Sequence, residues 1–149
     1  KLNLNPFIYP REREGCVDVT VSSKQYFQFI NKFLTWEGKK TYSVRLKNEV
    51  DTYNEVFLKG FVRGLMDTDG FVETSNVACG SVSKSLIEDI ARISDKFNII
   101  YKISKRDAKG NQKEFYLIRV KRQSLQKYSE IIGFSNLRKM NKLKAILEN

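Results

Sequence analysis

The sequence predicts an α+β protein that contains about one and a half copies of an αββαββα unit. Three observations support this fold class: short segments of alternating apolar residues predict strands, apolar residues three and four apart predict helices, and part of the pattern occurs twice. Hydrophobic residues make up 41% of the 149 positions, which is enough for a buried core. We therefore expect a single folded domain or a piece of a larger one.

The first part of the chain predicts a strand followed by a helix. Val17, Val19 and Val21 alternate with polar residues, which is typical of a strand with one buried face. Ser23 is a suitable N-cap for the helix that follows. The large apolar residues of this helix lie on one face, at Tyr26, Phe29, Ile30 and Phe33.

A second helix is predicted over residues 51–67, before a turn rich in aspartate. Its large apolar residues recur at every fourth position, at Phe57, Phe61 and Leu65. Gly60 and Gly64 have the same spacing, so the helix has a flat strip without side chains. A short hairpin that turns at Ser75 and Asn76 follows.

The remaining sequence predicts a helix, a second hairpin and two closing helices. The helix is capped by Ser83 or Ser85 and has an inward face formed by Leu86, Ile90, Ile93 and Phe97. The hairpin has a core-facing set comprising Ile99, Tyr101, Ile103, Tyr116, Ile118 and Val120. The closing helices are expected near residues 124–132 and 137–147.

An internal repeat organises these elements. Residues 19–40 resemble residues 118–139, so that Val21 corresponds to Val120 and Lys40 to Lys139, each 99 positions later. The later copy is preceded by a helix, a hairpin and a helix that the first copy lacks. We therefore expect residues 1–50 to be the end of a first repeat whose beginning is missing, and residues 51–149 to be a complete second repeat.

Charge and composition limit the possible functions. The formal net charge of +10 indicates an anionic partner, although a solubilising surface is the simpler alternative. The chain has no histidine, and its two cysteines lack paired spacing, which excludes a His/Cys zinc site and a histidine base. Chemistry must then use carboxylates, lysines and a metal bound by oxygen. No apolar run of 18 residues or signal peptide is evident, so we expect an intracellular protein without membrane contact.

The strongest motif lies at the end of the second predicted helix. Residues 62–70, VRGLMDTDG, resemble the motif of the LAGLIDADG homing endonucleases and keep Gly64, Asp67, Asp69 and Gly70. They depart from it at Val62, Arg63, Met66 and Thr68. The flanking helices and the terminal segment from Gly133 to Lys139 extend the resemblance over nearly the whole chain. The family fold has curved antiparallel sheets with helices on one face.

The resemblance implies a role for each part of the motif. Two motif helices pack together in this family, which assigns Gly60, Phe61 and Gly64 to a helix interface. Asp69 and the carbonyl of Thr68 are implied as Mg²⁺ ligands, and Asp67 as a structural residue at the helix end. The alternative for Asp67 to Gly70 is an ordinary C-capping turn.

Basic residues complete the implied site. The family places a lysine near the active centre, which matches Lys139 and its mirror Lys40 as catalytic residues. Lys84, at a strand-to-helix junction, is a weaker candidate and is assigned to DNA binding. Alternation along the second hairpin predicts a face suited to DNA phosphates and guanine edges, formed by Lys102, Ser104, Arg119 and Lys121. A merely solvated face is the alternative.

The implied function is site-specific, Mg²⁺-dependent cleavage of double-stranded DNA, by an enzyme encoded in an intron, in an intein or in a free-standing gene. Two other functions remain open: an RNA-binding intron maturase of the same fold, and a catalytically silent DNA-binding regulator. The second motif helix is expected either from a missing N-terminal half or from a second chain in a homodimer.

Overall fold

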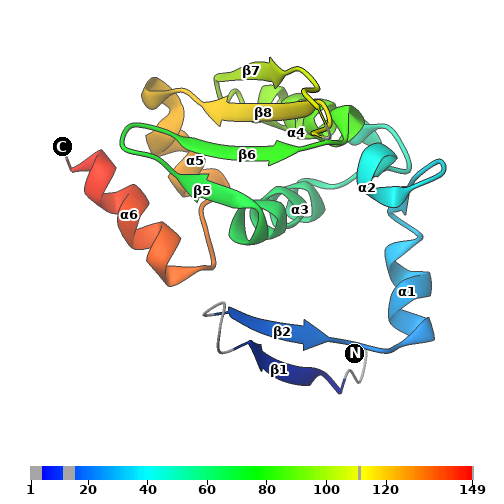
Figure 1. The fold of residues 1–149 in the computed structure, drawn as a ribbon. Helices are drawn as coiled ribbons and strands as arrows, with labels where there is room; N and C mark the ends of the chain where they lie inside the picture. Colours follow the sequence, from blue (N-terminus) through cyan, green and yellow to red (C-terminus); the bar gives the residue numbers. More distant parts are fainter. Residues whose placement is uncertain (1–4, 12–15, 111, 149) are drawn as a thin grey trace. The chain divides into compact units, whose positions relative to one another are not determined.

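The computed structural model describes residues 5–11, 16–110 and 112–148 of the chain. The protein divides into two compact units, Lys1–Leu34 and Thr35–Asn149. Figure 1 shows the order of the elements in each unit. The predicted boundary at residues 50 and 51 separates two copies of a sequence repeat, whereas these units are defined by contacts. The repeat boundary therefore stays a prediction.

The smaller unit contains one hairpin and one helix. Strands β1 (Phe7–Arg11) and β2 (Cys16–Thr20) pair in antiparallel fashion, and α1 (Lys24–Ile30) follows. Ser23 is the N-cap of α1, because its Oγ accepts a hydrogen bond of 3.1 Å from the Tyr26 amide. The predicted cap is confirmed. The side chains of Val17 and Val19, expected on a buried face, lie outside the described ones.

The larger unit begins with short elements that pack on a later helix. Strand β3 (Leu34–Thr35) pairs with β4 (Arg45–Leu46), and α2 (Lys40–Ser43) and the 3₁₀ helix η2 (Val50–Thr52) complete this segment. The Leu46 amide donates to the buried carboxylate of Asp89 at 2.7 Å, and Ser83 Oγ donates to the Val44 carbonyl at 2.8 Å. Asp89 is 5% exposed, and this burial raises the pKa of its carboxyl, while the Leu46 amide and Arg92 act in the opposite direction.

Helix α3 (Glu55–Thr68) carries the motif. Asn54 caps its N-terminus by accepting the Phe57 amide at 2.8 Å. The side that packs into the core is formed by Leu58, Val62 and Met66, each at most 2% exposed. These residues recur every four positions, so one full stripe of the helix is buried.

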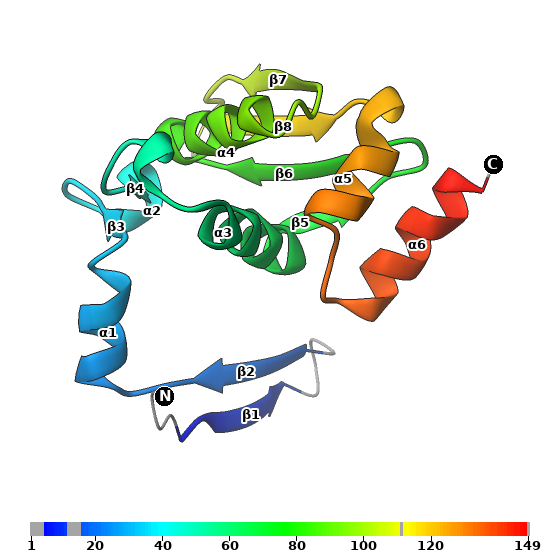
Figure 2. The ribbon, with the colours of Figure 1, turned by 180° about the vertical axis from the view of Figure 1, so that it is seen from behind.

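A four-stranded antiparallel sheet lies against α3. Its order is β5 (Gly70–Val72), β6 (Val77–Ser81), β8 (Phe115–Val120) and β7 (Tyr101–Arg106). Figures 1 and 2 show helices α3, α4 (Lys84–Lys96) and α5 (Leu125–Ile131) on the same face of this sheet. This grouping of three helices on one face of an antiparallel sheet agrees with the predicted α+β architecture.

The register of the sheet separates a core face from an open face. Cys79 pairs with Ile118 and Ile118 with Ile103, and the first two of these side chains are buried. Ile103 was expected in the core, but it is 41% exposed. The physical reason is its position on the edge strand β7, since α4 contacts β8 and β6 but reaches less far toward this edge.

The helices after the hairpins agree with the predicted pattern. In α4 the residues expected to face inward are all buried, and Ser83 is the N-cap. The 3₁₀ helix η3 (Arg122–Ser124), α5 and α6 (Leu137–Leu147) close the chain. The order β7, β8, α5, α6 matches the order β1, β2, α1, α2. Among the described residues, no helix is both long and apolar enough to cross a membrane.

Candidate active site and nucleic-acid interface

The C-terminus of α3 is held by a lysine from another helix. A helix leaves its last four carbonyls without partners inside the helix. Here the Leu65 carbonyl accepts the Asp69 amide at 2.9 Å. The next three carbonyls, of Met66, Asp67 and Thr68, accept Lys139 Nζ at 2.9, 2.7 and 3.3 Å. Lys139 lies in the first turn of α6, so α6 satisfies the end of α3.

Asp67 makes the reciprocal contact. Its carboxylate accepts the amide of Ser135 at 2.9 Å and the amide of Asn136 at 3.1 Å, at the N-terminal end of α6. The partial positive charge at the N-terminal end of α6 also stabilises a carboxylate at this position. We call these two sets of bonds, from Lys139 to α3 and from α6 to Asp67, the clasp.

The turn after α3 requires a glycine. A Cβ atom on Gly70 would lie 2.5 Å from the carbonyl oxygen of Met66. That carbonyl is one of those bound by Lys139. Gly70 therefore allows the chain to enter β5 directly beside the clasp.

Electrostatics near the motif follow from burial. Lys139 is only 9% exposed, and burial lowers the pKa of its ammonium, with the Asp67 carboxylate acting in the opposite direction. Burial, and then the charge of Asp69, raises the pKa of the Cys79 thiol to about 11. The Cys79 thiol is therefore neutral near pH 7 and a poor nucleophile.

Asp69 is the C-cap of α3 and is exposed to solvent. Its carboxylate and the nearby Thr68 carbonyl are hard oxygen donors, the type that Mg²⁺ and Ca²⁺ prefer. No group of three or more acidic, cysteine or histidine residues that could hold a metal occurs in the described part of the chain. The residues present thus fit a share of a divalent-metal site, and any further acidic ligands of such a site would have to come from outside the described residues.

The structure places Lys40 and Lys84 away from this end of α3. Lys40 begins α2, and its ammonium lies 5.5 Å from the centre of the Trp36 ring. Figures 1 and 2 both show α2 at the opposite end of the sheet from α6. Lys84 begins α4 and forms an ion pair of 3.1 Å with Glu88. Of the three predicted lysines, only Lys139 is brought to the motif.

The open face of the sheet contains the predicted DNA-contacting residues of β7 and β8. Arg119 pairs with Lys102 across the strands, and its Nη1 donates to Ser104 Oγ at 3.0 Å. Its Nε lies 3.4 Å from the carboxylate of Glu73. Arg119 is therefore held in one orientation while its side chain stays about a third exposed. Lys102 is exposed beside it, and Lys121 is exposed just after β8.

The glycine strip of α3 is open. A Cβ atom built on Gly60 or on Gly64 has no atom within 4 Å among the described residues. Val56, one helical turn earlier, is 82% exposed. This face of α3 can therefore accept another helix at close approach.

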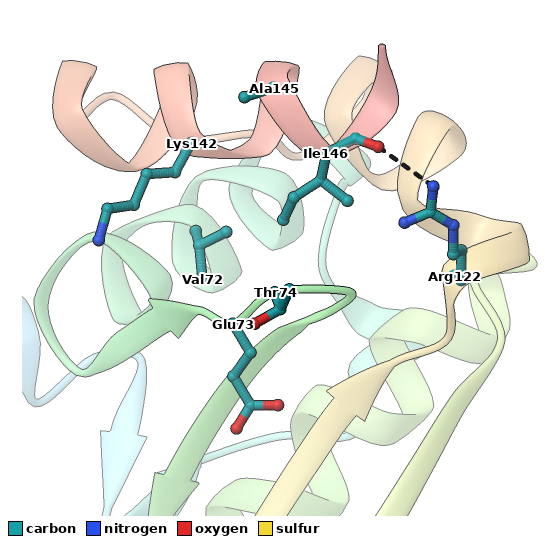
Figure 3. Close-up of a pocket in the computed structure, with 7 residues that line it drawn as sticks. All are labelled: Val72, Glu73, Thr74, Arg122, Lys142, Ala145 and Ile146. Atoms are coloured by element: carbon teal, nitrogen blue, oxygen red, sulfur yellow. Dashed lines mark hydrogen bonds between the residues drawn. The ribbon is translucent and has the colours of Figure 1, made fainter. Parts of the chain in front are cut away.

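Figure 3 shows a pocket between the first hairpin of the sheet and α6. Arg122 Nη2 donates to the Ile146 carbonyl at 3.3 Å at its edge. The pocket is lined by Val72, Glu73, Thr74, Arg122, Lys142, Ala145 and Ile146. It includes none of the predicted site residues, so it is distinct from the motif.

Besides the clasp, Glu73 and Asn136 make contacts at the site that were not predicted from sequence. Glu73 orients Arg119. The one sequence signal for this contact is the opposite charge of the two residues on nearby strands. Asn136 caps α6 by accepting the Lys139 amide at 3.2 Å. Asparagine before a helical segment is a recognisable signal for that cap.

Family comparison matches residues 57–133, just over half of the chain, to the LAGLIDADG-like domain. The chain belongs to the LAGLIDADG-like domain family. The matched range begins within the motif helix and ends after α5.

The fold is also similar to that of the homing endonuclease I-DmoI in two crystal structures, one with DNA and Mn and the other with DNA and Ca. Their TM-scores are 0.65 and 0.67, at 17% and 15% identity. The matches cover 88% and 97% of this chain, and 64% and 68% of I-DmoI. At this identity the likeness concerns the fold alone, and it confirms the predicted fold class.

Three curated relatives come from Methanocaldococcus jannaschii. The replication factor C small subunit is 34% identical over 133 residues, which are 89% of this chain and 7% of the relative. Glutamine–fructose-6-phosphate aminotransferase is 27% identical over 85% of this chain and 12% of its own length. The RNA polymerase subunit Rpo1C is 26% identical over 89% of this chain and 14% of its own length. The chain thus spans a small part of each relative.

Proposed function

We propose that the chain is the motif-bearing part of a site-specific DNA endonuclease of the homing type. The observation that carries the proposal is the end of α3, where Asp69 and the Thr68 carbonyl stand together on a helix end fixed by the clasp. A nearby sheet face with Lys102 and Arg119 supplies the positive charge that a DNA backbone needs. The net charge of +10 also favours binding to the negatively charged DNA backbone.

Mg²⁺ is the proposed cofactor. Asp69 and the Thr68 carbonyl would hold it together with an acidic residue from a second motif helix. When bound, such an ion neutralises phosphate charge and activates water for hydrolysis. The use of divalent ions is supported by the I-DmoI structures, which contain Mn, Ca or Mg. The chain itself keeps its two oxygen donors on a rigid helix end.

The second motif helix would pack against the open strip at Gly60 and Gly64. Its source would be either a further segment of the same protein or a second copy of this chain. In either case the backbone of α3 can be approached closely only because these two positions lack side chains. A partner helix would also cover the exposed side chain of Val56.

Among the genetic settings, we propose an intein-type insertion. The three curated relatives have unrelated names, and the chain matches only 7%, 12% and 14% of their lengths. A segment shared by proteins of unrelated activity is not required for any one of those activities, which favours an inserted module. A host protein whose mature mass still includes this segment would contradict the proposal.

The nuclease proposal is tested with Asp69→Asn in the full-length protein. An amide is a poor Mg²⁺ ligand and cannot offset phosphate charge, so cleavage should fall by a factor of about 100 or more. Folding and DNA affinity should stay at the parental level. Cleavage is measured with Mg²⁺ on a DNA library of random sites.

The matched control is Asp51→Asn, an exposed carboxylate in η2 that pairs with Lys96. It should cleave like the parent. Equal cleavage by parent and Asp69→Asn would contradict the assignment of Asp69. Tight binding of structured RNA, without any DNA cleavage by the parent, would instead favour the maturase function.

A further inference from the structure

We propose that Lys139 is a positioning residue, which fixes the metal-binding end of α3 through its carbonyls, and that it does not contact the DNA phosphate. The inference rests on the proposed function. It departs from the catalytic role that the sequence resemblance implies for a lysine at this site.

The number of donors carries the argument. A lysine ammonium has three N–H donors and no acceptor. In this structure Lys139 Nζ lies within hydrogen-bond distance of three carbonyl oxygens, of Met66, Asp67 and Thr68. Each donor therefore has an acceptor on α3, and none is left for a phosphate oxygen.

Burial supports the same conclusion. Lys139 is 9% exposed and is one of the few buried charged residues of the described chain. To bind a phosphate, Lys139 would have to break its hydrogen bonds to three carbonyls, of which that of Met66 is buried and the other two are partly buried. An unpaired buried carbonyl costs free energy, and here the three carbonyls belong to consecutive residues at a helix end.

The consequence for the site follows from the chain order. Thr68 and Asp69 directly follow the two carbonyls that lie closest to Lys139, those of Met66 and Asp67 at 2.9 and 2.7 Å. The bond to the Thr68 carbonyl is the longest at 3.3 Å, and a carbonyl has a second lone pair for another ligand. Lys139 can thus hold the last turn of α3 while Thr68 and Asp69 remain able to bind a cation.

Asp67 makes the positioning mutual. Its carboxylate binds the amides of Ser135 and Asn136, which lie just before the helix that carries Lys139. The ends of α3 and α6 therefore fix each other from both sides. A lysine whose only task was to offer charge to DNA would not need this second set of bonds.

The inference is tested with Lys139→Met in the full chain, with Lys144→Met as the control. Lys144 lies on the exposed side of α6. Without the clasp, amide hydrogen exchange in residues 64–70 should become faster by about tenfold. The affinity for Mn²⁺, measured by the relaxation of water protons, should fall by about tenfold, as is typical when a supporting residue of a metal site is removed. The control should match the parent in both measurements.

Cleavage kinetics separate positioning from direct catalysis. If Lys139 positions the metal ligands, the cleavage defect of Lys139→Met should shrink as the Mn²⁺ concentration rises. Parental hydrogen exchange and parental Mn²⁺ affinity, with cleavage lost at every Mn²⁺ concentration, would overturn the inference in favour of direct phosphate contact. Mn²⁺ affinity is measured on the assembled protein that includes the second motif helix, because the described residues hold only a share of the site, and absence of Mn²⁺ binding by that assembly would also overturn the inference.

Failure of the nuclease proposal gives a different result. If the parent does not cleave DNA, yet Lys139→Met weakens Mn²⁺ binding and speeds exchange, the positioning inference holds without the nuclease. If Lys139→Met fails to fold, Lys139→Arg keeps N–H donors at this position. It should show intermediate exchange and Mn²⁺ affinity, whereas parental values with lost cleavage would contradict the inference.

Discussion

Replacing Gly70 by alanine should destabilise the protein, although alanine is the smallest possible addition. The new Cβ would lie 2.5 Å from the Met66 carbonyl oxygen and 2.7 Å from the Met66 Cα. Both atoms belong to the backbone of α3, which cannot turn aside as a flexible side chain can. Either β5 must separate from α3, or the Met66 carbonyl must leave its hydrogen bond of 2.9 Å with Lys139.

The magnitude follows from these two routes. Overpacking of a tight site costs about 1–3 kcal/mol, and loss of a hydrogen bond to a charged group costs about 1.5–3 kcal/mol. Because relaxation along one route partly avoids the other, we expect Gly70→Ala to lower the free energy of unfolding by about 2–4 kcal/mol. For a chain of this length that corresponds to a fall in Tm of about 5–12 °C.

The assay is urea unfolding followed by circular dichroism, with Gly60→Ala as the matched control. A Cβ at Gly60 has no described neighbour within 4 Å, and this position lies within α3. Alanine should therefore stabilise the free chain there by about 0.5–1 kcal/mol through helix propensity. The same chemical change should thus have opposite signs at the two glycines. A Gly70→Ala protein as stable as the parent would refute the tight approach of β5 to α3.

Two further predictions concern the partners of the site. Arg119→Ala should weaken DNA binding and, if the arginine reads a guanine, relax base preference by about 1–3 kcal/mol at one position. Lys121→Ala should weaken binding to all sequences alike and reduce the salt dependence by about one unit. Titrations at several salt concentrations distinguish the two, and parental affinity in both variants would indicate a solvated face. Gly64→Leu should leave the free chain folded but cost about 1–3 kcal/mol in pairing with a second motif helix, so that sedimentation velocity and cleavage both change. Lys144→Leu, at an exposed position of α6, is its control, and normal assembly and cleavage by Gly64→Leu would contradict the helix-pairing proposal.

Local signals were sufficient to predict most of the fold. The α4 helix has an apolar stripe and a serine cap, and both features depend on residues three or four positions apart. The hairpin at Ser75 and Asn76 likewise follows from turn chemistry, with the Glu73 amide bonded to the Asn76 carbonyl at 2.9 Å. Ile103 shows the limit of such reasoning. The alternation of residues predicts on which face of β7 the Ile103 side chain lies. Its exposed fraction depends on whether a helix covers that edge of the sheet.

The candidate site was predicted only in part, because its decisive contacts join residues far apart in the chain. The motif letters identified Asp67 and Asp69, and the repeat pointed to Lys139. Neither could show that Lys139 is directed at the carbonyls of Met66 and Asp67, 73 and 72 positions away. A lysine in the first turn of a helix usually faces solvent, so the direction of this side chain depends on how α6 packs.

The clasp also explains why motif letters alone do not define a competent site. The sequence from Gly64 to Gly70 can specify a helix end, but the four last carbonyls of α3 need partners, and within the described residues Lys139 donates to three of them. A related chain with the same motif and no donor at the corresponding position of α6 would have to satisfy those carbonyls with water. Water would satisfy the hydrogen bonds without fixing the turn, and the carboxylate that follows would lose its defined position. On the proposed function, competence for metal binding is therefore a property of the pair α3 and α6, and the residue on α6 is as diagnostic as the aspartates.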